Sequence, residues 1–153
     1  MEKIASFQVN HDTLKKGMYI SRVDGDIITF DIRMKIPNSG DYLDMDSAHT
    51  LEHLFATYAR NSLWKDSVIY VGPMGCRTGF YLLLRNTVSF ENAIALVKES
   101  MAFARDFQGE IPGSKKEECG NYLAHNLAGA KKLGEEMCAV LQKWSVENLH
   151  YEE

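Results

Sequence analysis

From residue 28 to residue 36, hydrophobic and polar side chains alternate without interruption. The apolar positions are Ile28, Phe30, Ile32, Met34 and Ile36, and the polar positions between them are Thr29, Asp31, Arg33 and Lys35. A period of two is typical of a β-strand, because successive side chains point to opposite faces. Residues 27–36 are therefore predicted to form a half-buried antiparallel strand with a polar working face, ending at a Pro-Asn-Ser-Gly turn.

The remaining pattern predicts further strands and three long helices. The strands are expected at residues 18–23, 67–71 and 76–84, and the helices at about residues 47–61, 90–107 and 128–149. Asp46 or Ser47 is the predicted N-cap of the first helix, and Ser89 that of the second. A polar loop and a short extended piece to Leu127 precede the last helix. This order predicts a single domain over residues 1–153 with an α+β fold, an antiparallel sheet covered by helices on one face.

Composition narrows the class of protein. The 153 residues carry a formal net charge of −4 and no basic run, which argues against a nucleic-acid partner. No apolar run is long enough to span a bilayer, and the first residues have no apolar segment of the secretory type. Cys76, Cys119 and Cys138 are odd in number and widely separated. We therefore expect no disulfide framework. We expect a cytoplasmic location, where thiols stay reduced.

The sequence His49-Thr50-Leu51-Glu52-His53 is the most specific short motif in the chain. Histidines four residues apart share one helix face, so they can hold one divalent metal ion, and Glu52 lies beside them, close enough to move protons. The order H-x-x-E-H is the inverse of the usual zinc-peptidase motif. The alternative is two histidines that merely share a solvated or packed helix face.

The cysteines are candidates for the remaining chemistry. Cys119 follows a polar loop and is a candidate third ligand, because two histidines, one cysteine and an open position make a catalytic metal site. Cys76 ends a Pro-Met-Gly turn beside Arg77, where a thiol of lowered pKa can act as base or nucleophile. Alternatively, Cys119 is a loop cysteine without a partner and Cys76 a core cysteine. Cys138 is interpreted as packing, and His125 as a competing ligand or a polar residue near the site or on the surface.

Five segments together resemble the LuxS family of S-ribosylhomocysteine lyases, in the family's order and at near-family spacing. They are Ser6-Phe7 with His11, Phe30-Asp31-Ile32-Arg33, His49-Thr50-Leu51-Glu52-His53, Pro73-Met74-Gly75-Cys76-Arg77-Thr78-Gly79-Phe80-Tyr81, and Glu118-Cys119-Gly120. The resemblance covers nearly the whole chain. It implies a fold related to that of the H-x-x-E-H peptidases, and a homodimer with active sites at the interface.

The resemblance also implies the roles of individual residues. The implied metal ligands are His49, His53 and Cys119, holding one divalent ion per subunit, Fe(II) in the cell with Zn(II) or Co(II) able to replace it. The implied acid–base pair is Cys76 and Glu52. The implied substrate-binding residues are Ser6, His11 and Arg33 for the ribosyl part and Arg60 for the homocysteine part.

The implied reaction is a metal-assisted isomerisation and β-elimination of S-ribosylhomocysteine. It yields homocysteine and 4,5-dihydroxy-2,3-pentanedione, the precursor of autoinducer-2, in the activated methyl cycle and quorum sensing. Two positions depart from the family pattern, Tyr70 in place of Asp and Thr29 in place of Lys. Two other functions stay open: an H-x-x-E-H peptidase, which needs a glutamate as third ligand, and a binding module with a closed four-ligand metal site.

Overall fold

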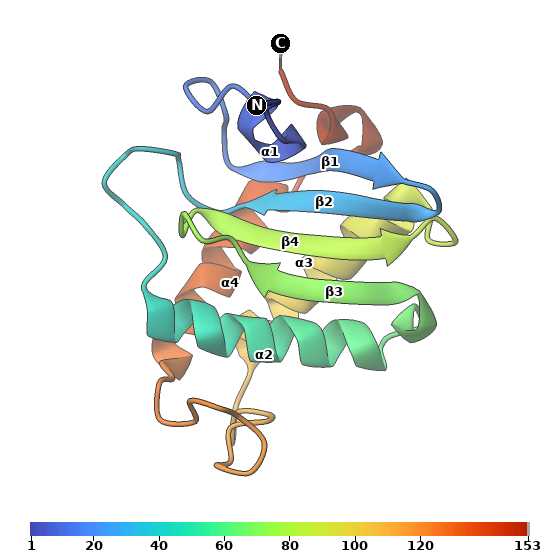
Figure 1. Ribbon diagram of the computed structural model, residues 1–153. Coiled ribbons are helices and arrows are strands. Elements are labelled where there is room, and N and C mark those ends of the chain that lie inside the picture. The colour runs from blue at the N-terminus through green and yellow to red at the C-terminus, as the bar shows by residue number, and fades with distance from the viewer. Residues whose placement is uncertain (153) are drawn as a thin grey trace.

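Four antiparallel strands form one sheet in the spatial order β1-β2-β4-β3 (Figure 1). The structure is a computed structural model, and residues 1–152 are described. The strands are β1 (Gly17–Asp24), β2 (Ile27–Arg33), β3 (Val68–Pro73) and β4 (Gly79–Arg85). β1 and β2 are joined by a hairpin, and so are β3 and β4, and β2 pairs with β4 in the centre of the sheet.

Three long helices pack on this sheet and on one another: α2 (Met45–Asn61), α3 (Phe90–Asp106) and α4 (Leu127–Leu141) (Figure 1). The predicted α+β class, an antiparallel sheet covered by helices on one face, is confirmed. The shorter elements are the helix α1 (Ala5–Gln8) and the 3-10 turns η1 (Lys65–Ser67) and η2 (Val146–Leu149). Among the described residues, no helix is long and apolar enough to cross a membrane.

The alternating pattern of β2 places its apolar residues in the core, as predicted. Phe30 pairs with Leu82 and Ile32 with Phe80 on β4, and all four side chains are fully buried against the helices. The polar residues between them do lie on the other face, but Asp31 and Arg33 are only 1% and 3% exposed. The predicted polar face is therefore present, but Asp31 and Arg33 on it are buried.

Several predicted boundaries are wrong for identifiable reasons. The N-cap of α2 is Asp44, whose carboxylate accepts the backbone N–H of Ser47, so neither Asp46 nor Ser47 caps the helix. β2 ends at Arg33, because the next two backbone N–H groups both donate to the carbonyl of Thr78 instead of continuing the ladder. Cys76 precedes β4 in a turn, and the expected extended piece before Leu127 consists of turns.

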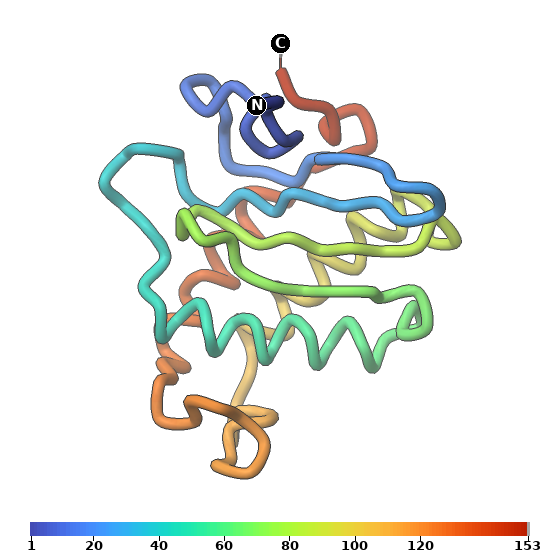
Figure 2. The backbone as a smooth tube through the Cα atoms, viewed as in Figure 1, coloured from blue at the N-terminus to red at the C-terminus, as the bar shows by residue number. Residues whose placement is uncertain are grey.

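The last helix is shorter than predicted and the chain then turns back over the sheet. α4 ends at Leu141, and the Trp144 indole N–H donates to the carbonyl of Met18 on β1 (2.9 Å). The Trp144 ring also packs against Gly17. A Cβ atom at Gly17 would lie 2.2 Å from the nearest carbon of that ring, so only glycine fits there. Figure 2 shows the result: the two ends of the chain meet beside β1, where α1 and the C-terminal tail lie together.

Candidate metal centre and active site

The first three turns of α2 carry both histidines of the H-x-x-E-H motif. Leu51, Leu54 and Phe55 are fully buried and fix one face of this helix in the core. His49 and His53 lie on another face, half-buried, against the long loop between α3 and α4. Their rings are 4.7 Å apart between centroids and nearly perpendicular, at 86°. The predicted sharing of one helix face is confirmed.

Backbone carbonyls of that loop orient both rings. The Nδ1–H of His49 donates to the carbonyl of Ala124, and the Nδ1–H of His53 to that of Pro112, each at 2.7 Å. With Nδ1 protonated, the lone pair of each neutral imidazole is on Nε2, the atom left free for a metal ion. Gly113 has φ +69°, and a Cβ atom there would lie 3.2 Å from His53 Nδ1, so glycine allows this close approach.

Cys119 completes the group from the same loop. Its Sγ is 3.4 Å from His49 Nε2 and accepts the backbone N–H of Asn121, also at 3.4 Å. Two tetrahedral zinc ligands, a sulfur at about 2.3 Å and a nitrogen at about 2.0 Å from the ion, are separated by about 3.5 Å. The S–N separation observed here is therefore that of neighbouring ligands.

His125 is the fourth member of this cluster. One ligand atom from each of His49, His53, Cys119 and His125 lies within 4.8 Å of the others. Nδ1 of His125 is 2.8 Å from the hydroxyl of Thr50, and its Nε2 is buried and has no partner among the described residues. Burial lowers the pKa of His125, and the neighbouring His49 and His53 rings lower it further.

Ring geometry distinguishes His125 from the other three donors. The His125 ring is stacked on that of His49, at 4.0 Å between centroids and 21° between planes. An imidazole binds a metal ion in its ring plane, at about 2.0 Å, and two planes this close to parallel do not meet at that distance. His49 and His125 therefore do not aim at the same point. The four donors form a cluster that could hold a divalent metal ion, with the His125 ring stacked on that of His49.

Cys76 sits at the tip of the turn between β3 and β4. The Arg77 N–H donates to the carbonyl of Met74 (3.0 Å), Arg77 has φ +61°, and the Cys76 thiol is exposed. The Leu43 N–H donates to the carbonyl of Arg77 (2.8 Å), which ties this turn to the segment that leads into α2. The turn and the start of α2 thus lie at the same end of the molecule (Figure 1).

The Cys76 thiol is connected to the predicted substrate residue Arg33. Sγ of Cys76 is 3.1 Å from the hydroxyl of Thr78, which accepts an N–H of the Arg33 guanidinium at 2.7 Å. Arg33 also donates to both carboxylate oxygens of Asp31, at 3.1 and 2.7 Å, in a buried ion pair.

The other predicted site residues lie in separate places within the chain. Ser6 lines a pocket of about 350 Å³ on the outer face of the sheet, together with Thr29 and Tyr70, the two positions that depart from the family pattern. His11 Nδ1 donates to the carbonyl of Val9 (2.8 Å). Arg60, in the last turn of α2, donates to the carbonyls of Val68 and Ile69 and is about 16 Å along the helix from His49.

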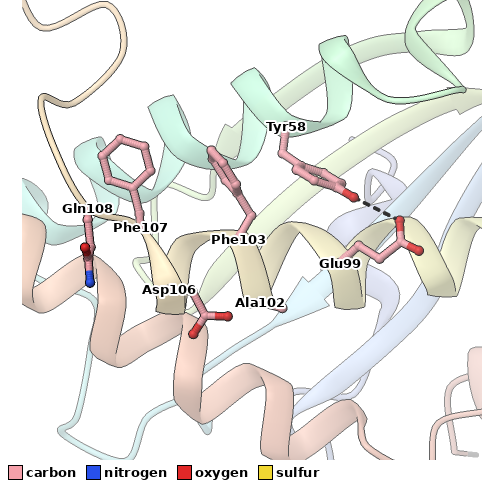
Figure 3. Close-up of a pocket in the computed structure, with 7 residues that line it drawn as sticks. All are labelled: Tyr58, Glu99, Ala102, Phe103, Asp106, Phe107 and Gln108. Atoms are coloured by element: carbon pink, nitrogen blue, oxygen red, sulfur yellow. Dashed lines mark hydrogen bonds between the residues drawn. The ribbon is translucent and has the colours of Figure 1, made fainter.

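A hollow of about 590 Å³ between α2 and α3 is unrelated to this chemistry (Figure 3). Its lining is aromatic and acidic: Tyr58, Glu99, Ala102, Phe103, Asp106, Phe107 and Gln108. It contains none of the predicted ligands or acid–base groups.

Comparison with known proteins identifies the family to which this chain belongs. Residues 4–148 match the family model described as S-Ribosylhomocysteinase (LuxS). The chain belongs to the LuxS family. Its similar relatives include S-ribosylhomocysteine lyases of Porphyromonas gingivalis (48% identical, 99% of each chain), Clostridium acetobutylicum (46%, 100% of each) and Phocaeicola vulgatus (44%, 99% of this chain and 98% of the relative). The chain thus belongs to a family of lyases and carries a cluster of four residues that could hold a metal ion.

Sequence reasoning missed part of the surroundings of this metal-ligand cluster. His125, predicted as a competing ligand or a polar residue near the site or on the surface, lies in the cluster, stacked on His49. Thr78 gave no signal apart from its place in the segment that resembles the family. The contact of Asp31 with the C-terminal Tyr151 joins residues 120 positions apart, and no local pattern predicts it.

Proposed function

We propose that this LuxS-family chain is an S-ribosylhomocysteine lyase, a carbon–sulfur lyase that acts on the sugar part of its substrate. The observation that carries the proposal is the convergence of His49, His53 and Cys119 into an open metal site, in a chain that matches named lyases over its full length. Three protein ligands and an open fourth position are typical of catalytic metal sites, whereas structural sites use four protein ligands.

His49, His53 and Cys119 would hold one divalent metal ion, and His125 lies beside them in the same cluster. Fe(II) is the expected ion, and Zn(II) or Co(II) can replace it, because this donor set accepts several divalent ions. When bound, the ion acts as a Lewis acid that polarises oxygen atoms of the sugar. The carbonyls of Ala124 and Pro112 hold the two imidazoles in the orientation that binding requires.

The chemistry of the substrate explains why proton-moving side chains are needed. The thioether is at C5 of the ribose, whereas the open-chain sugar has its carbonyl at C1. A β-elimination that expels the thiol needs the carbonyl at C3. The carbonyl must therefore move from C1 to C2 and on to C3, and each shift removes a proton from one carbon and returns one to its neighbour.

Cys76 and Glu52 are the proposed acid–base pair. Thr78 accepts a hydrogen bond from Arg33, so its own proton is free to donate to the Cys76 sulfur. In the proposed mechanism the Cys76 sulfur takes up and returns the carbon-bound protons on one side of the sugar. Glu52, half-buried on α2 between the two histidines, serves the other side and assists the loss of the thiol. The products are homocysteine and 4,5-dihydroxy-2,3-pentanedione, the autoinducer-2 precursor of quorum sensing.

The complete enzyme is proposed to be a cytoplasmic homodimer with active sites at the interface. Helices cover one face of the sheet, and the other face carries the pocket that contains Ser6, so a second copy has a surface to pack against. Arg60 is far along α2 from His49 in the same chain, which is consistent with its serving the partner's site. Ser6, His11 and Arg33 would hold the ribosyl part of the substrate and Arg60 the homocysteine part.

The test is to incubate protein loaded with Fe(II) or Co(II) with S-ribosylhomocysteine, to measure the thiol released and to identify the products by mass spectrometry. We expect homocysteine and the pentanedione in equal amounts, and no thiol from metal-free protein. Fully loaded protein that releases no thiol would overturn the proposal. Cleavage of peptides under the same conditions would favour the peptidase, and metal binding without either activity would favour a binding module.

A further inference from the structure

The C-terminal tail ends on the polar residues of β2. Tyr151 donates its hydroxyl proton to Oδ2 of Asp31 at 2.7 Å, and its ring stacks on Tyr19 of β1, with centroids 4.9 Å apart and planes at 22°. Asp31 is 1% exposed. A buried carboxylate needs all of its hydrogen bonds, because an unmet acceptor keeps its full desolvation cost. The tail therefore helps to hold this carboxylate in one orientation.

From Asp31 an unbroken chain of hydrogen bonds leads to the Cys76 thiol. Asp31 accepts two bonds from the Arg33 guanidinium, Arg33 donates onward to Thr78 Oγ1, and Thr78 lies 3.1 Å from Cys76 Sγ. The side chains of Asp31, Arg33 and Thr78 are all at most 4% exposed. Water therefore has little access to the bonds among these three side chains, and a change at Asp31 is transmitted to Thr78.

Each of these bonds has a defined donor: Tyr151 and Arg33 both donate to Asp31, and Arg33 also donates to Thr78. Burial raises the pKa of Tyr151, and Asp31 raises it further, so the phenol stays a proton donor. Because Tyr151 and Arg33 together satisfy Asp31, the guanidinium is held in the plane in which its third donor meets Thr78. Thr78, having accepted, has its hydroxyl proton left for the Cys76 sulfur.

We propose that Tyr151 is a positioning residue for the reactive thiol, acting through Asp31, Arg33 and Thr78 to keep a hydrogen-bond donor on Cys76. The role of Cys76 in turnover rests on the proposed function, but the hydrogen-bond chain and its effect on the thiol do not. Tyr151 thus acts on the active site from a distance, since its hydrogen bond goes to Asp31 and not to Cys76.

The test compares Tyr151→Phe with Tyr19→Phe in metal-loaded, full-length protein. Both changes remove one hydroxyl and keep the stacked ring pair. The Tyr19 hydroxyl, however, donates to the carbonyl of Lys15 and takes no part in the hydrogen-bond chain from Tyr151 to Cys76. The first readout is the rate of alkylation of Cys76 by iodoacetamide at neutral pH, followed by mass spectrometry with Cys138 as internal reference. The second is kcat and KM for thiol release.

We expect Tyr151→Phe to slow alkylation of Cys76 about fivefold, which corresponds to the free energy of one hydrogen bond. The alkylation rate of Cys138 should not change. kcat should fall by a similar factor with KM unchanged, and Tyr19→Phe should match wild type in both readouts. In a Thr78→Val background the chain is already broken, so adding Tyr151→Phe should change the alkylation rate no further.

Two results would overturn the inference: alkylation of Cys76 in Tyr151→Phe at the wild-type rate, or an equal slowing by Tyr151→Phe in the Thr78→Val background. The second would mean that the tail acts by a route other than this chain. Alkylation requires no substrate, so absence of lyase activity would contradict the proposed function while leaving this test decisive.

Discussion

Removal of Arg33 should destabilise the protein far more than removal of a comparable arginine on the surface. Arg33 and Asp31 form an ion pair whose side chains are 4% and 1% exposed. Arg33→Met keeps the length of the aliphatic chain but leaves the Asp31 carboxylate buried with only the Tyr151 hydroxyl as a partner. Breaking a buried pair by removing one partner costs about 3–5 kcal/mol in free energy of unfolding.

The expected loss of stability in Arg33→Met can also be expressed as a fall in melting temperature. For a chain of this size each kcal/mol corresponds to roughly 2–4 °C, so Arg33→Met should melt about 6–20 °C below wild type. The free energy of unfolding should be measured by urea titration followed by circular dichroism, because an unchanged slope shows that the variant is still folded and two-state.

Arg22→Met is the matched control. Arg22 also pairs with a carboxylate two residues away on the same sheet, that of Asp24, but the two side chains are 54% and 51% exposed. Water screens such a pair, so its loss should leave the urea midpoint nearly unchanged. Adding Asp31→Asn to Arg33→Met removes the stranded charge and should recover part of the loss. Equal effects of Arg33→Met and Arg22→Met would refute this reasoning.

Three further predictions concern the metal centre and the helix that carries it. His49→Asn should no longer bind one metal ion per chain, as judged by atomic absorption after dialysis. His125→Asn should keep one ion per chain, with its metal affinity lowered by no more than about 10–100-fold. Equal loss of metal from both variants would mean that the ion has four protein ligands. Gly113→Ala should weaken metal binding about tenfold in a chelator competition, because the added methyl pushes on the His53 ring, and wild-type affinity would show that the loop adapts. Asp44→Ala should cost about 1 kcal/mol in urea unfolding through loss of the α2 cap, and an unchanged midpoint would show that the helix needs no cap.

Local sequence patterns were sufficient to predict the helices and strands that bury one regular face. The alternation around Phe30 and Ile32 identified β2, and the apolar stripe of α2 placed His49 and His53 on one side of a helix before any contact was known. Both features depend on the repeat of the backbone itself, two residues for a strand and 3.6 for a helix, so a single sequence contains them.

Features made by distant parts of the chain were not predictable in this way. α4 was expected to continue to residue 149, because helical spacing persists there, but Trp144 instead bonds to β1 and packs over Gly17. Asp31 and Arg33 were expected on a polar face, but the pattern gave no sign of their burial, and the Tyr151 hydroxyl that contacts Asp31 comes from the far end of the chain. Tertiary contacts of this kind override local preference.

The proposal depends most on Cys76 as a base that is separate from the metal ligands, and one comparison tests this directly. Wild type and Cys76→Ala should be loaded with Co(II), assayed for bound metal, and then given S-ribosylhomocysteine while released thiol is followed with a chromogenic disulfide. We expect one metal ion per chain in both proteins, and thiol release only from wild type. Turnover by fully loaded Cys76→Ala at the wild-type rate would contradict the proposed mechanism.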